Sequence, residues 1–263
     1  MDILRTHAIF FSAAGTTRQI TEAIATGIGN PDIRFHDLLL QAPKEAVTIP
    51  ACETALFVMP VYAGRIPQPA TKALEQIHGE KTPAIIACVY GNRHYDDALR
   101  ELRDRVEKQG FSVISAGLFI AQHSIFPRVA AGRPDAADLA EAKQFGKESR
   151  QWLSTHPEWA TSPRIDVPGN YPYRPTMNPP LKPKTNRHCN GCGICAAQCP
   201  AGAIDKENPR HLDPGKCLSC AHCIAVCPQR AKHFGGLVYR LAARQFFKKF
   251  ATPQKNHCIY RLK

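Results

Sequence analysis

Short apolar runs alternate with segments of helical periodicity through the first 155 residues of the chain. The apolar runs are strand-sized and bounded by polar or turn residues, as in buried parallel strands, and cover residues 7–11, 33–36, 55–59, 84–90 and 112–120. Helical spacing covers residues 17–28, 69–77, 96–109 and 134–153, whereas residues 37–54 give no well-defined helix. This alternation predicts an α/β domain over residues 1–155, with a parallel sheet covered by helices on both faces.

The rest of the chain divides into three segments of different composition. Residues 156–184 contain eight prolines, which predicts a stiff, extended linker. Residues 185–234 are rich in cysteine, and residues 235–263 form a basic tail. In the tail, apolar residues recur on one face of a predicted amphipathic helix, namely Tyr239, Ala242, Ala243, Phe246, Phe247 and Phe250. We expect this face to dock on the body of the protein, with an acidic redox partner, nucleic acid or a membrane surface as alternatives.

Charge is distributed unevenly along the chain. Residues 1–150 hold 17 basic and 17 acidic residues, whereas residues 151–263 hold 17 basic and 5 acidic ones, which accounts for the entire net charge of +12. Such asymmetry indicates two regions with different partners. We expect redox partner proteins with acidic docking surfaces, and no nucleic acid.

The N-terminal sequence has no signal-peptide pattern, and no apolar run approaches the length of a membrane span. We therefore expect a soluble, cytoplasmic protein. In a reducing compartment, 11 cysteines are more typical of metal binding than of disulfides.

Two cysteine runs carry the most specific pattern in the sequence. Both follow the spacing C-x2-C-x2-C-x3-C-P; the first consists of Cys189, Cys192, Cys195 and Cys199, and the second of Cys217, Cys220, Cys223 and Cys227. Zinc is the alternative, but zinc sites usually take paired cysteines from two separated C-x2-C motifs. The runs resemble those of bacterial two-cluster ferredoxins. That resemblance implies two 4Fe-4S clusters, the first held by Cys189, Cys192, Cys195 and Cys227, and the second by Cys217, Cys220, Cys223 and Cys199.

The segment after the first predicted strand, FSAAGTTRQI, lacks the glycine spacing of a dinucleotide-binding fingerprint and the lysine of a Walker A loop. A hydroxyl-rich turn of this kind also arises as a simple helix N-cap. It resembles the phosphate loop of flavodoxins, where hydroxyls and backbone amides at a helix N-terminus hold FMN. By this resemblance the phosphate site comprises Ser12, Ala13, Ala14, Gly15, Thr16 and Thr17. Ala14 departs from the pattern, because flavodoxins usually carry a hydroxyl there.

Two more loops, MPVYAGRIP and YGNRHYDDAL, follow predicted strands. Together with the cysteine runs, the three loops resemble the flavodoxin-ferredoxin fusion proteins of anaerobic bacteria. That resemblance implies a flavodoxin-like doubly wound sheet of five parallel strands in the order 2-1-3-4-5, followed by a C-terminal α+β dicluster ferredoxin-like domain. It also implies FMN contacts from Pro60, Val61, Tyr62, Ala63, Gly64, Arg65, Tyr90, Gly91, Asn92, Arg93 and Tyr95.

The resemblance further suggests roles for these residues. Tyr62 or Tyr95 would stack on the flavin ring, Gly64 would form the turn that faces N5, and Gly91 and Asn92 would face the pyrimidine end. Arg65, Arg93 or His94 would stabilise the anionic hydroquinone if one of them faces N1; solvated loop charges are the alternative.

These features favour an iron-sulfur flavoprotein that passes electrons between FMN and two 4Fe-4S clusters, with no catalytic side chain required. The alternative is a flavin-dependent reductase of a small organic substrate fed by its ferredoxin domain, with His94 or Tyr95 as proton donor. A third hypothesis makes the clusters a redox sensor whose basic tail binds nucleic acid.

Overall fold

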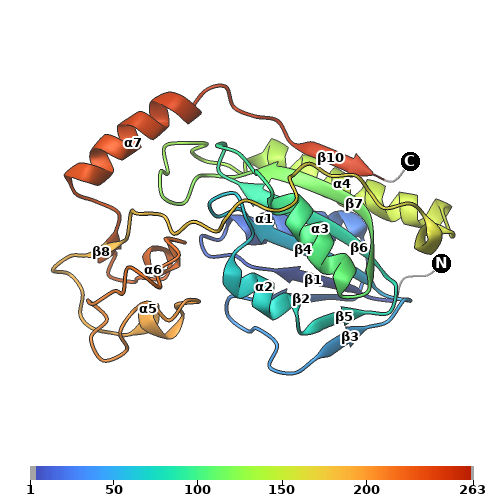
Figure 1. Ribbon diagram of the computed structural model, residues 1–263, viewed down its shortest axis with the longest axis horizontal. Coiled ribbons are helices and arrows are strands. Elements are labelled where there is room, and N and C mark those ends of the chain that lie inside the picture. The colour runs from blue at the N-terminus through green and yellow to red at the C-terminus, as the bar shows by residue number, and fades with distance from the viewer. Residues whose placement is uncertain (1–3, 262–263) are drawn as a thin grey trace.

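A parallel sheet forms the centre of the N-terminal domain (Figure 1). The computed structural model describes residues 4–261, and within this range five parallel strands are neighbours in the order β2 (Ile33–Asp37), β1 (Thr6–Phe10), β4 (Thr54–Pro60), β6 (Thr82–Tyr90) and β7 (Phe111–Ile120). Every residue of the three central strands is buried, as expected for strands covered on both faces. Counted along the chain within this sheet, the order is 2-1-3-4-5.

Helices cover both faces of the sheet, which confirms the predicted α/β class. The helices α1 (Thr16–Ile28) and α4 (Ala136–Thr155) pack against each other, and α2 (Gln68–Leu74) contacts α3 (Ala98–Lys108) on the other side (Figure 1). Two glycines allow the α1–α4 approach: a Cβ atom at Gly146 would lie 2.1 Å from the carbonyl oxygen of Ile24, and one at Gly27 would lie 1.9 Å from that of Lys143.

The structure departs from the expected sheet at two places. Residues 38–53 form turns and the short strand β3 (Val47–Ile49), which pairs with β5 (Ile77–Gly79) in a separate parallel ribbon. The five expected parallel strands are present, and β10 (Cys258–Arg261) adds to β7 as an antiparallel sixth strand that was not predicted. This addition covers the backbone groups of β7 that would otherwise form an open sheet edge.

The proline-rich segment is held along α3. Arg103 donates to the carbonyl oxygen of Ile165 at 2.8 Å, and Tyr173 donates to a carboxylate oxygen of Asp104 at 2.5 Å. The segment also contributes buried apolar residues to the core of the N-terminal domain, including Trp159 in the 3-10 turn η1 (Trp159–Thr161), Ile165 and Val167. The connector is therefore fixed on the surface of this domain.

The cysteine-rich module is small and has its own apolar cluster. It contains the short helices α5 (Ile194–Ala197) and α6 (His222–Ala225), and the ribbon of β8 (Lys184–Thr185) with β9 (Lys232–His233). A bridge between Ile204 and Leu212 closes the hairpin between the two cysteine runs. The helices α5 and α6 begin 28 residues apart, which is also the distance along the sequence between the two cysteine runs.

The tail leads the chain back from this module to the N-terminal domain. The helix α7 (Leu237–Phe250) follows β9, and the chain then runs to β10 at the edge of the sheet (Figure 1). The predicted docking face of α7 is half-buried, whereas Leu237, Val238 and Leu241 are exposed. The cysteine-rich module is thus attached at both ends. Residues 1–3 and 262–263 of the expected domain and tail lie outside the described residues.

Within residues 4–261, no helix combines the length and the apolar character that crossing a bilayer requires.

Candidate functional site

The loop after β1 has the backbone features expected of an anion-binding loop. Gly15 adopts a left-handed φ of 89° and caps α1 without a side-chain hydrogen bond, and the first turn of this helix has no acidic residue. The hydroxyl of Ser12 accepts a hydrogen bond from the backbone N–H of Arg18 at 3.0 Å. Ser12 thereby holds the loop, while the positive end of the helix dipole faces the strand ends.

Two adjoining cavities lie at the carboxyl ends of the parallel strands. The first, here the strand-end cavity, has a volume of about 60 Å³ and is lined by loops after β1, β4, β6 and β7. The second, here the interdomain cavity, has a volume of about 260 Å³ and extends from the loops after β4, β6 and β7 to the proline-rich segment, the cysteine-rich module and α7. Both are lined by Val61, Tyr62, Tyr90, Gly91, His123 and Ser124.

Most of the residues predicted to bind the flavin line one or both cavities. These are Ala13, Ala14, Thr16, Thr17, Pro60, Val61, Tyr62, Ala63, Gly64, Tyr90, Gly91 and Arg93. Among the described residues, those that line the two cavities include neither Asp nor Glu. The structure therefore brings the three predicted loops together around space whose lining contains no acidic residue.

The loop after β4 makes a tight turn toward the interdomain cavity. Tyr62 and Arg65 exchange two backbone hydrogen bonds, of 2.9 and 3.1 Å, around Ala63 and Gly64, which have φ values of 51° and 85°. Positive φ at both central positions is the type I′ arrangement. A Cβ atom at Gly64 would lie 2.4 Å from a carboxylate oxygen of Asp96, so this position requires glycine.

The structure contradicts the predicted role of Arg65. Its guanidinium makes a bidentate ion pair with Glu101 of α3, at 2.6 and 2.7 Å, and donates to the carbonyl oxygen of Arg174 at 2.6 Å. The hydrogen-bonded Glu101 carboxylate raises the pKa of Arg65 above its ordinary value. Arg65 is committed to this buried pair and lines neither of the two cavities, so it ties the loop to α3 and the linker instead of facing a flavin ring.

Asn92 and Tyr95 also have other partners than those predicted. The Asn92 side chain is 1% exposed and hydrogen-bonds to the tail. Tyr95 packs edge-on against Tyr90, with ring centroids 5.6 Å apart, and His94 stacks on it. Neither Asn92 nor Tyr95 lines the cavities, whereas Tyr62 lines both. Of the two proposed stacking residues, only Tyr62 is positioned for that role.

A fourth loop, residues 121–124, follows β7 and lines both cavities, although it was not among the predicted flavin loops. His123 of this loop lines both cavities and contacts Phe126 and Phe246 through its ring. Burial, and to a smaller extent the charge of Arg93, lowers the pKa of His123 to about 4. The available signal was position: like the other three loops, this one comes directly after the carboxyl end of a parallel strand.

The eight clustered cysteines surround two separate small cavities. One is lined by Cys189, Cys192, Cys195 and Cys227, and the other by Cys199, Cys217, Cys220 and Cys223. Each cavity thus takes three sulfurs from one run and the fourth from the other run. Burial raises the pKa of Cys220 and of Cys223 to about 12, so these two sulfurs release protons when they bind metal.

The second cysteine run contacts the strand-end loops directly. Leu218 and Ser219, between Cys217 and Cys220, line the interdomain cavity. Burial, with a smaller contribution from Cys220, raises the pKa of Tyr62 well above its ordinary value. Lys182 of the linker donates to the carbonyl oxygen of Cys217 at 2.6 Å. The cavity lined by Cys199 and the second run is therefore the one next to the N-terminal domain.

Comparison with known proteins identifies the C-terminal module. Residues 188–231 match the family described as 4Fe-4S dicluster domain. The module therefore binds two 4Fe-4S clusters, and the predicted ferredoxin-like domain is confirmed. The chain combines this domain with an α/β domain whose order of parallel strands, 2-1-3-4-5, is that of the flavodoxin-like fold.

Similar proteins share only parts of the chain. Trichloroethene reductive dehalogenase of Dehalococcoides mccartyi is 32% identical over 101 residues, which cover 32% of this chain and 18% of that protein. A component of the ion-translocating oxidoreductase complex of Methanosarcina acetivorans is 48% identical over 44 residues, covering 16% of this chain and 17% of that protein. The chain thus spans less than a fifth of each of these two relatives. Among solved structures, flavodoxin 1 from Bacillus cereus aligns with a TM-score of 0.41 at 16% identity and covers 56% of this chain and 97% of that chain.

Proposed function

We propose that this protein transfers electrons between FMN, bound in the strand-end and interdomain cavities, and the two 4Fe-4S clusters of its C-terminal domain. The observation that carries this proposal is the shared lining of the interdomain cavity. Tyr62 and Gly91 of the flavodoxin-like domain line the same space as Leu218 and Ser219, which lie between two cysteines. A flavin ring in this cavity would be in contact with the segment that holds a cluster.

The residues present suit FMN. The loop from Ser12 to Thr17 ends at the N-terminus of a 13-residue helix whose first turn has no acidic residue, which suits a phosphate. The interdomain cavity is bounded mainly by apolar and aromatic side chains, among them Tyr62, Phe126 and Phe246, and its cationic lining residues are Arg93 and Arg174. Bound there, FMN would supply a group that exchanges one or two electrons, whereas each cluster exchanges one.

We assign the cluster ligands in crossed sets. The set of Cys199, Cys217, Cys220 and Cys223 would hold the cluster next to the flavin, and the set of Cys189, Cys192, Cys195 and Cys227 would hold the outer cluster. The geometry supports the order flavin, inner cluster, outer cluster for internal electron transfer. Cys192 of the outer set is exposed, which suits exchange with external partners.

Two connections keep the cofactor sites in one arrangement. Asp97 of the flavodoxin-like domain accepts hydrogen bonds from the backbone N–H groups of Asn170 and Arg174 in the linker, at 2.8 and 2.7 Å. At the other end of the module, Tyr239 of α7 donates to the carbonyl oxygen of Ile125 at 2.9 Å. A module fixed at both ends favours internal transfer over a swinging carrier.

Anaerobic purification followed by metal and flavin analysis tests this function. We expect about 8 iron and 8 sulfide per chain, from two 4Fe-4S clusters, together with one FMN. Photoreduction of the flavin should then produce the electron paramagnetic resonance signals of reduced clusters in a dilution-independent reaction. Stoichiometric zinc, or a protein that does not bind added FMN, would refute the proposal.

A second candidate function rests on a third cavity, of about 460 Å³, that lies between the two domains. It is lined by Tyr62 from the flavin side, by Leu218 from the cysteine-rich side, and by Lys72, Met177 and Lys216. A small organic anion in this space would lie next to the flavin, as a substrate of a flavin-dependent reductase must. His94 lines the neighbouring interdomain cavity and could donate a proton, whereas Tyr95 lines neither cavity. Turnover that requires an added organic acceptor would establish this activity.

The external partners we propose are redox proteins with acidic docking surfaces. The outer face of α7 carries the cationic residues Arg240, Arg244, Lys248 and Lys249, all exposed, and such a stripe attracts acidic surfaces over the Debye length. Electron transfer to an acidic ferredoxin should therefore slow as ionic strength rises. We also propose a cytoplasmic location, because the reducing cytosol suits eight clustered thiols.

A further inference from the structure

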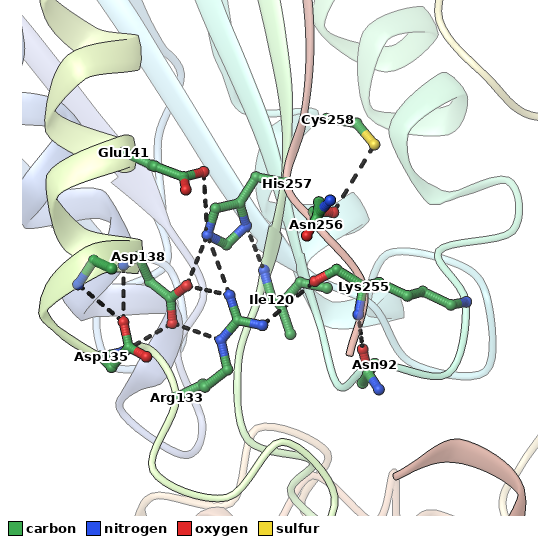
Figure 2. Close-up of polar contacts among 11 residues, drawn as sticks. Asn92, Ile120, Arg133, Asp135, Asp138, Glu141, Lys255, Asn256, His257 and Cys258 are labelled. Atoms are coloured by element: carbon green, nitrogen blue, oxygen red, sulfur yellow. Dashed lines mark hydrogen bonds and ion pairs between the residues drawn. The ribbon is translucent and has the colours of Figure 1, made fainter. Parts of the chain in front are cut away.

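The C-terminal segment, residues 246–258, contacts two of the loops that line the cavities. The side chain of Asn92 is bonded to this segment at three points: its amide nitrogen donates to the carbonyl oxygens of Phe250 and Pro253, at 2.8 and 3.3 Å, and its amide oxygen accepts from the backbone N–H of Lys255 at 2.9 Å. The last of these bonds is drawn in Figure 2. Asn92 therefore faces the tail, although it lies in a predicted flavin loop.

The backbone around Asn92 makes this attachment important for the cavity. Asn92 adopts a left-handed φ of 57°, and its neighbour Gly91 lines both cavities. A Cβ atom at Gly91 would lie 2.8 Å from His123, so the loops after β6 and β7 are in close contact. The ammonium of Lys255 also donates to the carbonyl oxygen of Arg93. The tail thus holds the loop at its left-handed residue and at the residue that follows it.

A second attachment acts on the loop after β7. The His257 side chain is 3% exposed; its Nδ1 accepts from the backbone N–H of Ile120 at 3.2 Å, and its Nε2 donates to a carboxylate oxygen of Asp138 at 2.9 Å (Figure 2). Arg133 also binds Asp138 through two hydrogen bonds, which fixes the orientation of the carboxylate. Ile120 directly precedes the cavity-lining residues 121–124.

A third contact reaches the interdomain cavity itself. Phe246 of α7 lines this cavity and stacks on Phe126, with ring centroids 4.3 Å apart and planes inclined by 26°. Its ring also meets the edge of His123 at 4.8 Å. The C-terminal segment therefore supplies one wall of the interdomain cavity, through Phe246, and it also holds the loops after β6 and β7, which form two other walls.

We propose that the C-terminal segment, residues 246–258, is part of the flavin site, and that Asn92 is a positioning residue that holds the loop after β6 in its binding conformation. The inference rests on the proposed function, because it assumes that FMN occupies these cavities. Its physical basis is preorganisation: a loop already held in the bound conformation loses less conformational entropy when ligand binds. The amphipathic α7 and β10 are thus structural requirements for binding FMN, in addition to connecting the two domains.

The test is an anaerobic FMN titration of the full-length protein with its clusters, followed by flavin fluorescence. The Asn92→Gly variant keeps access to a positive φ but removes all three bonds to the tail. We expect its dissociation constant for FMN to rise about 10- to 100-fold, the range for loss of two or three buried hydrogen bonds. The matched control is Gln151→Ala, which removes an exposed side-chain amide from α4, outside both cavities and outside the C-terminal segment, and should bind FMN as the unmodified protein does.

Hydrogen exchange provides a readout that does not depend on FMN. In Asn92→Gly, the amides of residues 90–93 should exchange faster, while those of the central strand β4 keep their protection. Equal FMN affinity and equal exchange in Asn92→Gly and the unmodified protein would overturn the inference. Failure of the unmodified protein to bind FMN would instead refute the proposed function. If Asn92→Gly does not fold, as judged by circular dichroism, the same comparison with His257→Ala decides.

Discussion

The Nδ1 atom of His222 lies 3.0 Å from the carbonyl oxygen of Ala13. His222 stands between two cysteines of the second run, and Ala13 belongs to the proposed phosphate loop, so this one contact joins the two cofactor regions. Because a carbonyl oxygen can only accept, Nδ1 carries the hydrogen. His222 is 7% exposed and Ala13 3% exposed, so the bond is shielded from water and helps to set how closely the two domains dock.

Removal of this bond should loosen the docking of the two domains. We expect His222→Ala to destabilise the domain interface by about 1–2 kcal/mol and to slow electron transfer from photoreduced flavin to the clusters, measured by transient absorption. His222→Asn should restore much of the rate, because its amide nitrogen can donate from about the position of Nδ1. His188→Ala is the control, since His188 is exposed and also adjoins a cysteine. Equal rates in His222→Ala and His188→Ala would show that the contact does not govern transfer.

The crossed ligand sets predict different effects for two chemically identical substitutions. Cys199→Ser should impair the cluster next to the flavin, and Cys227→Ser the outer one, each lowering the iron content from about 8 toward 4 per chain. A magnetic interaction between flavin semiquinone and a reduced cluster should then disappear in Cys199→Ser and persist in Cys227→Ser. Electron paramagnetic resonance distinguishes the two. If instead Cys227→Ser alone abolished the interaction, the assignment of the sets would be reversed.

The parts of the fold that the sequence predicted depend on local pattern. The buried strands and α1, α3 and α4 lie within a few residues of their expected positions, because an apolar periodicity of 2 or 3.6 residues can be recognised within a short stretch of sequence. The cysteine runs were equally easy to recognise from the sequence, since three of the four cysteines at each cavity lie within seven residues of the chain. The amphipathic face predicted for the tail is also the half-buried face of α7.

The mistaken predictions concern residues whose partners are distant in sequence. Arg65 pairs with Glu101, 36 positions away, and Asn92 bonds to tail residues about 160 positions away. Local pattern placed both residues correctly on strand-end loops but could not show which way their side chains point. The strand β10 was missed for a similar reason: four residues acquire strand geometry only by pairing with the edge of β7, and short segments have little intrinsic preference.

The Arg65–Glu101 pair predicts an effect on stability instead of on flavin potential. Glu101 is 1% exposed and also contacts Arg105 at 3.0 Å, so Arg65→Ala would leave a buried carboxylate with only one of its two cationic partners. We expect a loss of about 3 kcal/mol, equivalent to a fall in melting temperature of about 6–12 °C. Arg65→Met, which keeps the aliphatic volume, separates loss of charge from loss of packing. A large change in flavin midpoint potential without a change in melting temperature would show that Arg65 does act on the ring.

Acidification should destabilise the protein through His123. Burial lowers the pKa of this residue in the folded state to about 4, whereas an unfolded histidine titrates near 6.5. Between these pH values the unfolded state binds more protons than the folded state. The contribution of His123 to the free energy of unfolding is therefore fully present above about pH 6.5 and is lost as pH falls toward 4. The whole loss attributable to His123 is at most about 3 kcal/mol.

A comparison of variants isolates this contribution from other groups that titrate in the same range. Burial also lowers the pKa of His36, and the carboxylates make their own contribution to the pH dependence of the melting temperature. The unmodified protein alone therefore cannot show which residue is responsible. His123→Gln keeps a polar side chain of similar size but does not titrate, so its melting temperature should fall less steeply between pH 7 and 5 under anaerobic conditions. His36→Gln should remove a different and smaller part of the pH dependence of the melting temperature. If the melting temperatures of His123→Gln and the unmodified protein depended on pH in the same way, His123 would be protonated without cost in the folded state, and water would therefore reach its side chain.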